Sequence, residues 1–263
     1  EITREVARQG YRVIMVCLNE DHGTEVRDRI MKETGNRNIE VRQCDLSDMS
    51  QVRVLADGIC ATEQSVELLM NNAGTMQEER VRTVDGFEKT VAVNYMAPVL
   101  LTERLRPLLH GGSRVVFMVS LSADWGSITY PDLYTSGRKG SFWRILVYSN
   151  SKLALCLHVL RLARELQEQG IAVNGADPGI VSTPIIRMNM WFDPITDLVY
   201  RPLIRTPRQG ADTAIYLLLS PDVEGKTGDL YHSRKAKKLG KAYSEARQEE
   251  LWQHTEPLLR QWM

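Results

Sequence analysis

Short apolar stretches recur along the chain, and longer stretches between them repeat apolar residues every three or four positions. The short stretches are rich in Val, Ile, Leu and Met, a pattern typical of strands buried on both faces. We predict strands at Val13–Cys17, Ile39–Gln43, Val66–Met70, Arg114–Val119, Ile171–Ala176 and near Asp229–Tyr231.

The longer stretches predict helices, because their apolar residues share one helical face. Asp85 with Glu88 three residues later is typical of a capping box at a helix start. The predicted helices are Glu1–Gln9, His22–Thr34, Ser47–Glu63, Phe87–Leu109, Tyr148–Gln169, one that starts at Thr206-Pro207 and one at the C-terminus. This alternation predicts a doubly wound, Rossmann-like α/β fold with a parallel sheet. Neither a linker nor a repeat divides residues 1–263, so we expect a single domain.

Composition narrows the classes of function. Of 263 residues, 33 are Lys or Arg and 33 are Asp or Glu, and this zero balance gives no reason to expect a nucleic-acid partner. The basic run from Arg234 to Lys241 is interpreted as a solvated helix face. The four cysteines form no C-x-x-C pair, so we expect neither a disulfide framework nor a metal site. We see no transmembrane stretch or signal peptide and expect a cytoplasmic protein.

Small and polar residues follow three of the predicted strands. Asn71-Asn72-Ala73-Gly74 ends one, Ser120 ends another, and Pro178-Gly179 follows a third. Each pattern is also typical of an ordinary turn. In a doubly wound fold, however, these positions lie at the edge of the sheet where ligands bind.

Tyr148 and Lys152 stand four residues apart in a predicted helix, and therefore on one face. A phenol is a poor acid or base at neutral pH, and an ammonium one turn away would lower its pKa. Such a pair could exchange a proton with a hydroxyl or carbonyl oxygen. The same spacing also occurs in a surface tyrosine beside a solvated lysine.

These motifs occur in one order along the chain, together with Asn94, and this order resembles the short-chain dehydrogenase/reductase family across nearly the whole chain. Three stretches are most similar to its retinol dehydrogenase-like branch: Tyr148-Ser-Asn-Ser-Lys-Leu, Asp177-Pro-Gly-Ile-Val-Ser-Thr, and Gln209-Gly-Ala-Asp-Thr-Ala-Ile-Tyr with the Leu-Ser-Pro-Asp-Val-Glu-Gly of 219–225.

The resemblance implies a catalytic role for four residues. Tyr148 would be the general acid or base, and Lys152 would lower its pKa and hold the nicotinamide ribose. Ser120 would hydrogen-bond the substrate oxygen, and Asn94 would hold a water of a proton relay. The cofactor, NADP or NAD, would lie against Asp45, Leu46, Asn72, Ala73, Gly74, Tyr148, Lys152, Pro178, Gly179, Val181 and Thr183.

The chain departs from the family pattern at three places. The glycine-rich phosphate loop and the strand before it would precede Glu1, and without them we expect poor solubility and no measurable cofactor binding. Leu18 follows Cys17 where relatives often carry an Arg for NADP, and no Asp for NAD is present either, which leaves the preference open. Asp177 stands where many relatives have His, and we attach no consequence to it.

The resemblance thus predicts an oxidoreductase that interconverts an alcohol and a carbonyl on a small, lipophilic molecule. A lid at about 182–205, whose Met188, Met190, Trp191 and Phe192 suit an apolar pocket, would cover the substrate. The alternative is a non-catalytic nucleotide-binding or interaction protein on the same fold. We expect no metal. The predicted partner is a small-molecule substrate, and the prediction allows a homo-oligomer.

Overall fold

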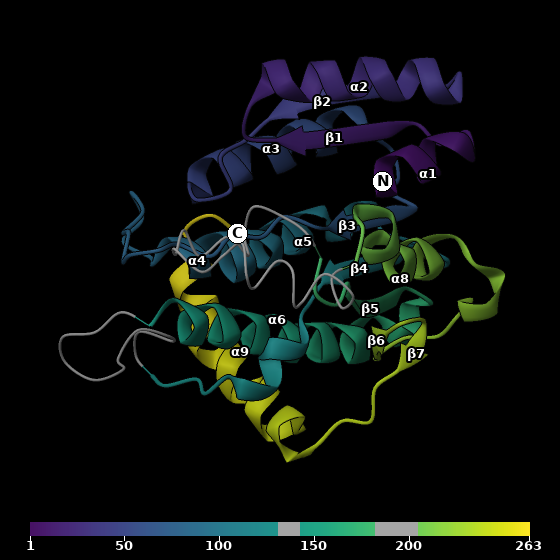
Figure 1. Cartoon of the computed structure of the whole chain (residues 1–263). Coiled ribbons are helices and arrows are strands. Elements are labelled where there is room, and N and C mark those ends of the chain that lie inside the picture. The colour runs from purple at the N-terminus through teal and green to yellow at the C-terminus, as the bar shows by residue number, and fades with distance from the viewer. Residues whose placement is uncertain (131–142, 182–204) are drawn as a thin grey trace, which may run out of the picture.

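The computed structural model describes residues 1–130, 143–181 and 205–263, which form one layer of strands flanked by helices (Figure 1). The strands are β1 (Val13–Cys17), β2 (Ile39–Gln43), β3 (Leu68–Asn71), β4 (Arg114–Met118), β5 (Ala172–Asp177), β6 (Leu230–His232) and β7 (Lys235–Ala236). The α-helices are α1 (Ile2–Arg8), α2 (Glu20–Thr34), α3 (Met49–Thr62), α4 (Lys89–Val91), α5 (Ala97–Leu105), α6 (Arg144–Leu166), α8 (Pro207–Leu219) and α9 (Glu245–Leu259).

The strands pair in parallel except at the last hairpin. β1 pairs with β2, and β3, β4, β5, β6 and β7 follow one another in a second sheet, in which only β6 and β7 are antiparallel. The predicted doubly wound parallel α/β fold is therefore confirmed. The carboxyl ends of the parallel strands share one edge, which brings the loops after β3, β4 and β5 together.

β1 and β3 do not pair with each other in the described residues, and both line one cavity of about 1400 Å³. The cavity continues past the carboxyl ends of the strands, where Tyr148 and Lys152 also line it. A single cavity thus connects the strand edges with the candidate site.

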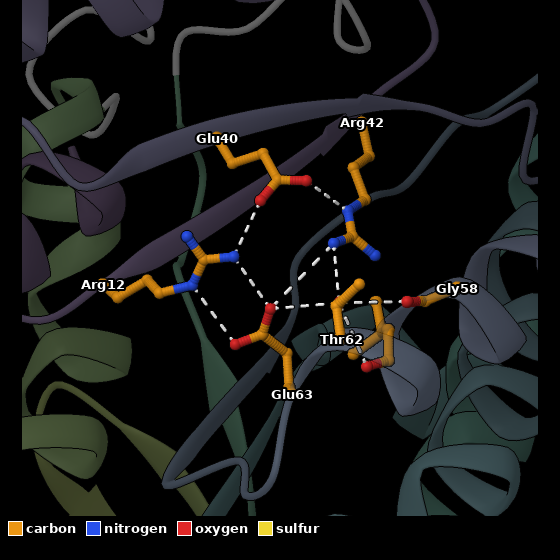
Figure 2. A network of polar contacts seen from close by, with 7 residues as sticks. Arg12, Glu40, Arg42, Gly58, Thr62 and Glu63 are labelled. Atoms are coloured by element: carbon orange, nitrogen blue, oxygen red, sulfur yellow. Dashed lines mark hydrogen bonds and ion pairs between the residues drawn. The ribbon is translucent and has the colours of Figure 1, made fainter.

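A polar network attaches the β1–β2 pair to the end of α3 (Figure 2). Arg12, just before β1, lies 2.8 Å from both Glu40 of β2 and Glu63 after α3. Arg42 of β2 donates to Glu40 at 2.6 Å and to Thr62 at 3.0 Å. The hydrogen bonds from these guanidinium groups lower the pKa of both Glu40 and Glu63. Because the network is partly exposed, each pair contributes at most about 1 kcal/mol.

Helices cover both faces of the larger sheet. α6 packs on β5 on one side and under α9, whereas α8 packs on β4 and β5 on the other side beside α1 (Figure 1). α6 is the only described helix with the length and apolar composition of a membrane span, when counted to Gln169, and 83% of its most apolar window is buried. Burial in the core accounts for that composition.

The structure corrects three sequence predictions. The helix expected at Phe87–Leu109 is broken by a π-helical turn, η1 (Ala92–Met96), between α4 and α5. Asp85 does not cap this helix. Glu88 does, by accepting from the backbone N–H of Val91, while Asp85 accepts from that of Met49 at the start of α3. Both carboxylates therefore cap helices, but in different places.

The basic run from Arg234 to Lys241 is not a helix face. Lys235 lies in β7, and the residues on either side of this strand form ion pairs, Arg234 with Asp212 and Lys237 with Asp124. Sequence periodicity could not separate a short edge hairpin from a helix here, because both expose charged side chains.

Candidate active site

Tyr148 and Lys152 lie one turn apart on α6, and both line the large cavity. The Lys152 side chain is almost fully buried, and its Nζ atom donates to the carbonyl oxygen of Met118, the last residue of β4, at 2.8 Å. Burial lowers the pKa of Lys152 to about 8. α6 begins at Arg144, one turn before the predicted start, which places Tyr148 inside the helix rather than at its end.

The environment of Tyr148 differs from the one we predicted. Burial raises its pKa, and a hydrogen bond with Ser120 opposes this rise. The Lys152 ammonium is 5.8 Å from the ring centre and donates to a backbone carbonyl instead of the phenol. Ser120, and not Lys152, is therefore the group that opposes the rise in the pKa of Tyr148, and the net shift is upward.

Ser120 begins the 3-10 helix η3 (Leu121–Trp125) directly after β4. Its hydroxyl oxygen accepts from the backbone N–H of Ser122 at 3.2 Å and from its hydroxyl at 3.0 Å. These two donors leave the Ser120 proton free to point at an acceptor such as the Tyr148 oxygen. The sequence analysis did not predict this contact with Ser122.

Asn94 lies in the π-helical turn η1, a feature frequent at functional sites. Its amide oxygen accepts from Thr75 N at 2.7 Å, and its amide nitrogen donates to Thr75 O at 2.9 Å and to Ser151 Oγ at 3.0 Å. Asn94 thus holds the segment after β3 against α6. Its expected role in binding a water stays a prediction.

The loop after β3 runs close to this group. Asn72, Ala73 and Gly74 line the cavity, and a Cβ atom on Gly74 would lie 3.6 Å from Lys152 Nζ and 3.5 Å from Asn94 Oδ1. A larger residue at Gly74 would fill the space beside the lysine. A Cβ atom alone would make ordinary contacts here, so the space beside the lysine would be lost only to a side chain larger than that of Ala.

The remaining predicted cofactor residues lie at two further places on the cavity wall. Asp45 and Leu46 line it beyond β2, and the Asp45 carboxylate accepts two hydrogen bonds from Ser47. Burial raises the pKa of Asp45, but the Ser47 hydrogen bonds outweigh it and the net shift is downward. Pro178, Gly179 and Val181 line the wall after β5. Thr183 and nearly all of the expected lid lie outside the described residues.

Ser120 and Asn94 are not among the residues that line the described cavity. Three residues that sequence reasoning did not assign, Asp177, Arg205 and His232, lie beside the turn after β5. Asp177 had been noted only as a departure from the family. Among the residues described, there is no group of three or more His, Cys, Asp or Glu that could hold a metal ion.

Comparison with known proteins defines the class of this protein. The chain matches the family model of the short chain dehydrogenases over residues 1–190. Human retinol dehydrogenase 11 is 34% identical over 239 residues, covering 88% of this chain and 72% of that protein. Mouse polyprenol dehydrogenase is 35% identical over 259 residues, covering 95% of this chain and 76% of that protein.

Solved structures are also similar to this chain. A protein from Mycobacterium paratuberculosis is 27% identical, with a TM-score of 0.74 and coverage of 98% of this chain and 88% of its own. A blue fluorescent protein from a metagenomic library, in complex with NADPH, is 25% identical, with a TM-score of 0.67 and coverage of 87% and 88%.

The chain therefore belongs to the short-chain dehydrogenase/reductase family, and it is an NAD(P)-dependent oxidoreductase that acts on CH–OH groups. Within the family it belongs to the retinol dehydrogenase-like branch. The cavity suits the cofactor, because a buried lysine, the side-chain-free position at Gly74 and the turn at Pro178-Gly179 meet on its wall.

Proposed function

We propose that Tyr148 is the general acid or base of an alcohol–carbonyl interconversion. The observation that supports this most is the placement of Tyr148 and Lys152 on one face of α6, at the cavity wall. In reduction the Tyr148 hydroxyl would give its proton to the carbonyl oxygen, and in oxidation its oxygen would take the alcohol proton. Ser120 would share the substrate oxygen with Tyr148.

Lys152 would hold the nicotinamide ribose hydroxyls, since its ammonium already donates at the cavity wall next to Gly74. Asn72, Ala73 and Gly74 would line one side of the cofactor, Pro178, Gly179 and Val181 the other, and Asp45 with Leu46 the adenine end. When bound, the cofactor supplies or accepts the hydride. Asn94 would keep Thr75 and Ser151 in place next to Lys152. It would also hold a water molecule through which Lys152 exchanges its proton.

We propose a lipophilic alcohol or aldehyde as substrate. The named relatives, a retinol dehydrogenase and a polyprenol dehydrogenase, point to isoprenoid alcohols. The apolar residues of the expected lid, Met188, Met190, Trp191 and Phe192, suit such a chain, although they lie outside the described residues. A cytoplasmic location and a homo-oligomeric state also stay predictions.

The test is oxidation of NADPH and NADH with a panel of aldehydes and ketones by the purified protein, made together with the upstream strand and glycine-rich loop that the resemblance predicts before Glu1. The panel should contain retinal, a polyprenyl aldehyde and short polar aldehydes of matched concentration. We expect turnover that increases with the length of the apolar chain and disappears in Tyr148→Phe. Turnover that persists in Tyr148→Phe would contradict the proposed acid, and equal turnover of polar aldehydes would contradict the proposed substrate class.

A further inference from the structure

Asp177 connects the cavity wall to the neighbouring strand. It is the last residue of β5, is 5% exposed, and lies opposite His232 of β6 in the strand register. One carboxylate oxygen accepts from the backbone N–H of Gly179 at 2.8 Å, and the other lies 3.2 Å from His232 Nδ1. The turn that carries Pro178 and Gly179 is therefore fixed by a side chain that is itself held by the sheet.

Arg205 holds the same turn from its other side. Its guanidinium donates to Pro178 O at 3.2 Å and to Ser233 Oγ at 2.7 Å, and its backbone N–H donates to Ile180 O at 2.7 Å. A Cβ atom on Gly179 would lie 3.0 Å from the Arg205 Nε atom, and the φ angle of Gly179 is +72°. Only glycine suits this left-handed, closely covered position.

Residues at the tip of the β6–β7 hairpin contact both Asp177 and Arg205. His232 contacts Asp177, and the next residue, Ser233, contacts Arg205. Ser233 and Arg234 are the two described non-glycine residues with positive φ, 51° and 62°. Two-residue hairpin turns of this type favour Asn-Gly, because side chains resist the left-handed region. Strain of this kind persists where the surrounding contacts impose it, and it is frequent at functional sites.

We infer that Asp177, held by His232, and Arg205, held by Ser233, are positioning residues through which the β6–β7 hairpin sets the cavity-facing turn Pro178-Gly179. The inference rests on the proposed function of that site.

The experiment compares four variants with the unaltered protein. Asp177→Ala removes the acceptor and the charge, and Asp177→Asn keeps an acceptor for Gly179 N–H but removes the charge. Ser233→Gly removes the anchor of Arg205 and relieves the strained φ angle. Asp212→Asn is the matched control, because it breaks the ion pair of Arg234 with α8 and touches neither Asp177 nor Arg205.

The first readout is amide hydrogen exchange at Gly179 without cofactor, so it is independent of activity. Asp177→Ala should speed this exchange at least about tenfold, since a hydrogen bond to a charged acceptor is lost. Asp177→Asn and Asp212→Asn should leave it within about threefold of the unaltered protein, a difference smaller than one hydrogen bond. Unchanged exchange in Asp177→Ala would overturn the inference.

The second readout is kinetic. Ser233→Gly should raise KM for the cofactor more than it lowers kcat, while its resistance to urea increases. An unchanged KM in Ser233→Gly would contradict the inference. If the unaltered protein neither binds nor turns over cofactor, the proposed function fails, and the exchange experiment still tests the turn.

Discussion

Lys152 of α6 donates from Nζ to the carbonyl oxygen of Met118 at the end of β4, 2.8 Å away, while its Nζ lies 5.8 Å from the ring centre of Tyr148. The lysine therefore joins the helix that carries the tyrosine to the strand that leads to Ser120. One buried lysine thus joins the two elements that carry the hydroxyl groups of Tyr148 and Ser120.

Tyr148→Phe should lower turnover by at least about 10²-fold, because it removes the proton that the reaction transfers and keeps the ring packing. Cofactor binding, followed by nicotinamide fluorescence, should persist. Tyr130→Phe is the matched control, since Tyr130 stacks on His254 and does not line the cavity. Near-normal turnover in Tyr148→Phe would remove the tyrosine from its assigned role.

Lys152→Ala should weaken both turnover and cofactor binding. One ammonium would bind the ribose hydroxyls, and it also donates to the carbonyl oxygen of Met118. Lys152→Arg should not restore full activity, since a planar, forked guanidinium replaces a compact point charge in a buried space. Calorimetric titration with NADPH and NADH measures the binding. If Lys152→Ala bound the cofactors as tightly as the unaltered protein, the ribose contact would be wrong.

Lys152→Met should make the protein more stable while it abolishes activity. Burial lowers the pKa of Lys152 from 10.5 to about 8, so the unfolded chain binds more protons than the folded one between these values. Stability of the unaltered protein should therefore rise with pH through this window, and Met should remove the slope. At pH 7 the free energy of unfolding of Lys152→Met should exceed that of the unaltered protein by an amount on the order of 3 kcal/mol. Urea unfolding of both proteins at several pH values checks this, and parallel curves would contradict it.

Much of the fold was predictable because the spacing of apolar residues along the chain distinguishes its strands from its helices. The strands β1 and β2 have the predicted bounds, and the helix that carries Tyr148 and Lys152 was identified from one apolar face. The interruption at Asn94 was not predictable, since a π-helical turn leaves the apolar pattern of Phe87–Leu109 nearly unchanged.

The motif residues of the site were predictable, but their contacts were not. Asp177 and His232 are 55 positions apart, and only the register of β5 and β6 brings them together. The pKa of Tyr148 depends on burial, which the local spacing of Tyr148 and Lys152 does not contain. Long-range packing, rather than any local motif, therefore determines the electrostatics of the site.

The cofactor preference should be weak, because Leu18 after β1 is 62% exposed and offers no charge to the adenosine ribose. The ratio of kcat/KM for NADPH to that for NADH should lie well under about a thousandfold in either direction, a span of about 4 kcal/mol. Leu18→Arg should raise this ratio at least about tenfold, by pairing with the 2′-phosphate. Leu18→Gln is the uncharged control. A ratio of about a thousand or more would place a determinant elsewhere.

His158→Leu should make the protein more resistant to acid. His158 lies fully inside the core, where the rings of Phe117 and Tyr95 meet it edge-on, and neither ring nitrogen has a partner in the described part of the chain. Burial, and then the charges of Arg161 and Arg106, lower its pKa to about 3 from 6.5.

The sign of the effect follows from proton binding. Between pH 6.5 and about 3 the unfolded chain holds a proton on His158 that the folded protein excludes, so stability falls as the pH falls through this window. At pH 4 the loss is on the order of 3 kcal/mol. Leucine has a similar volume and takes no proton, so the free energy of unfolding of His158→Leu should depend less on pH. Above pH 7 the two proteins should differ in this free energy by no more than about 2 kcal/mol, because removing the unsatisfied ring nitrogens and losing the ring contacts partly offset each other. His22→Leu, at an exposed position, is the control and should follow the unaltered protein. Thermal unfolding followed by circular dichroism from pH 4 to pH 8 measures all three, and an equal acid loss in His158→Leu would mean that another group causes it.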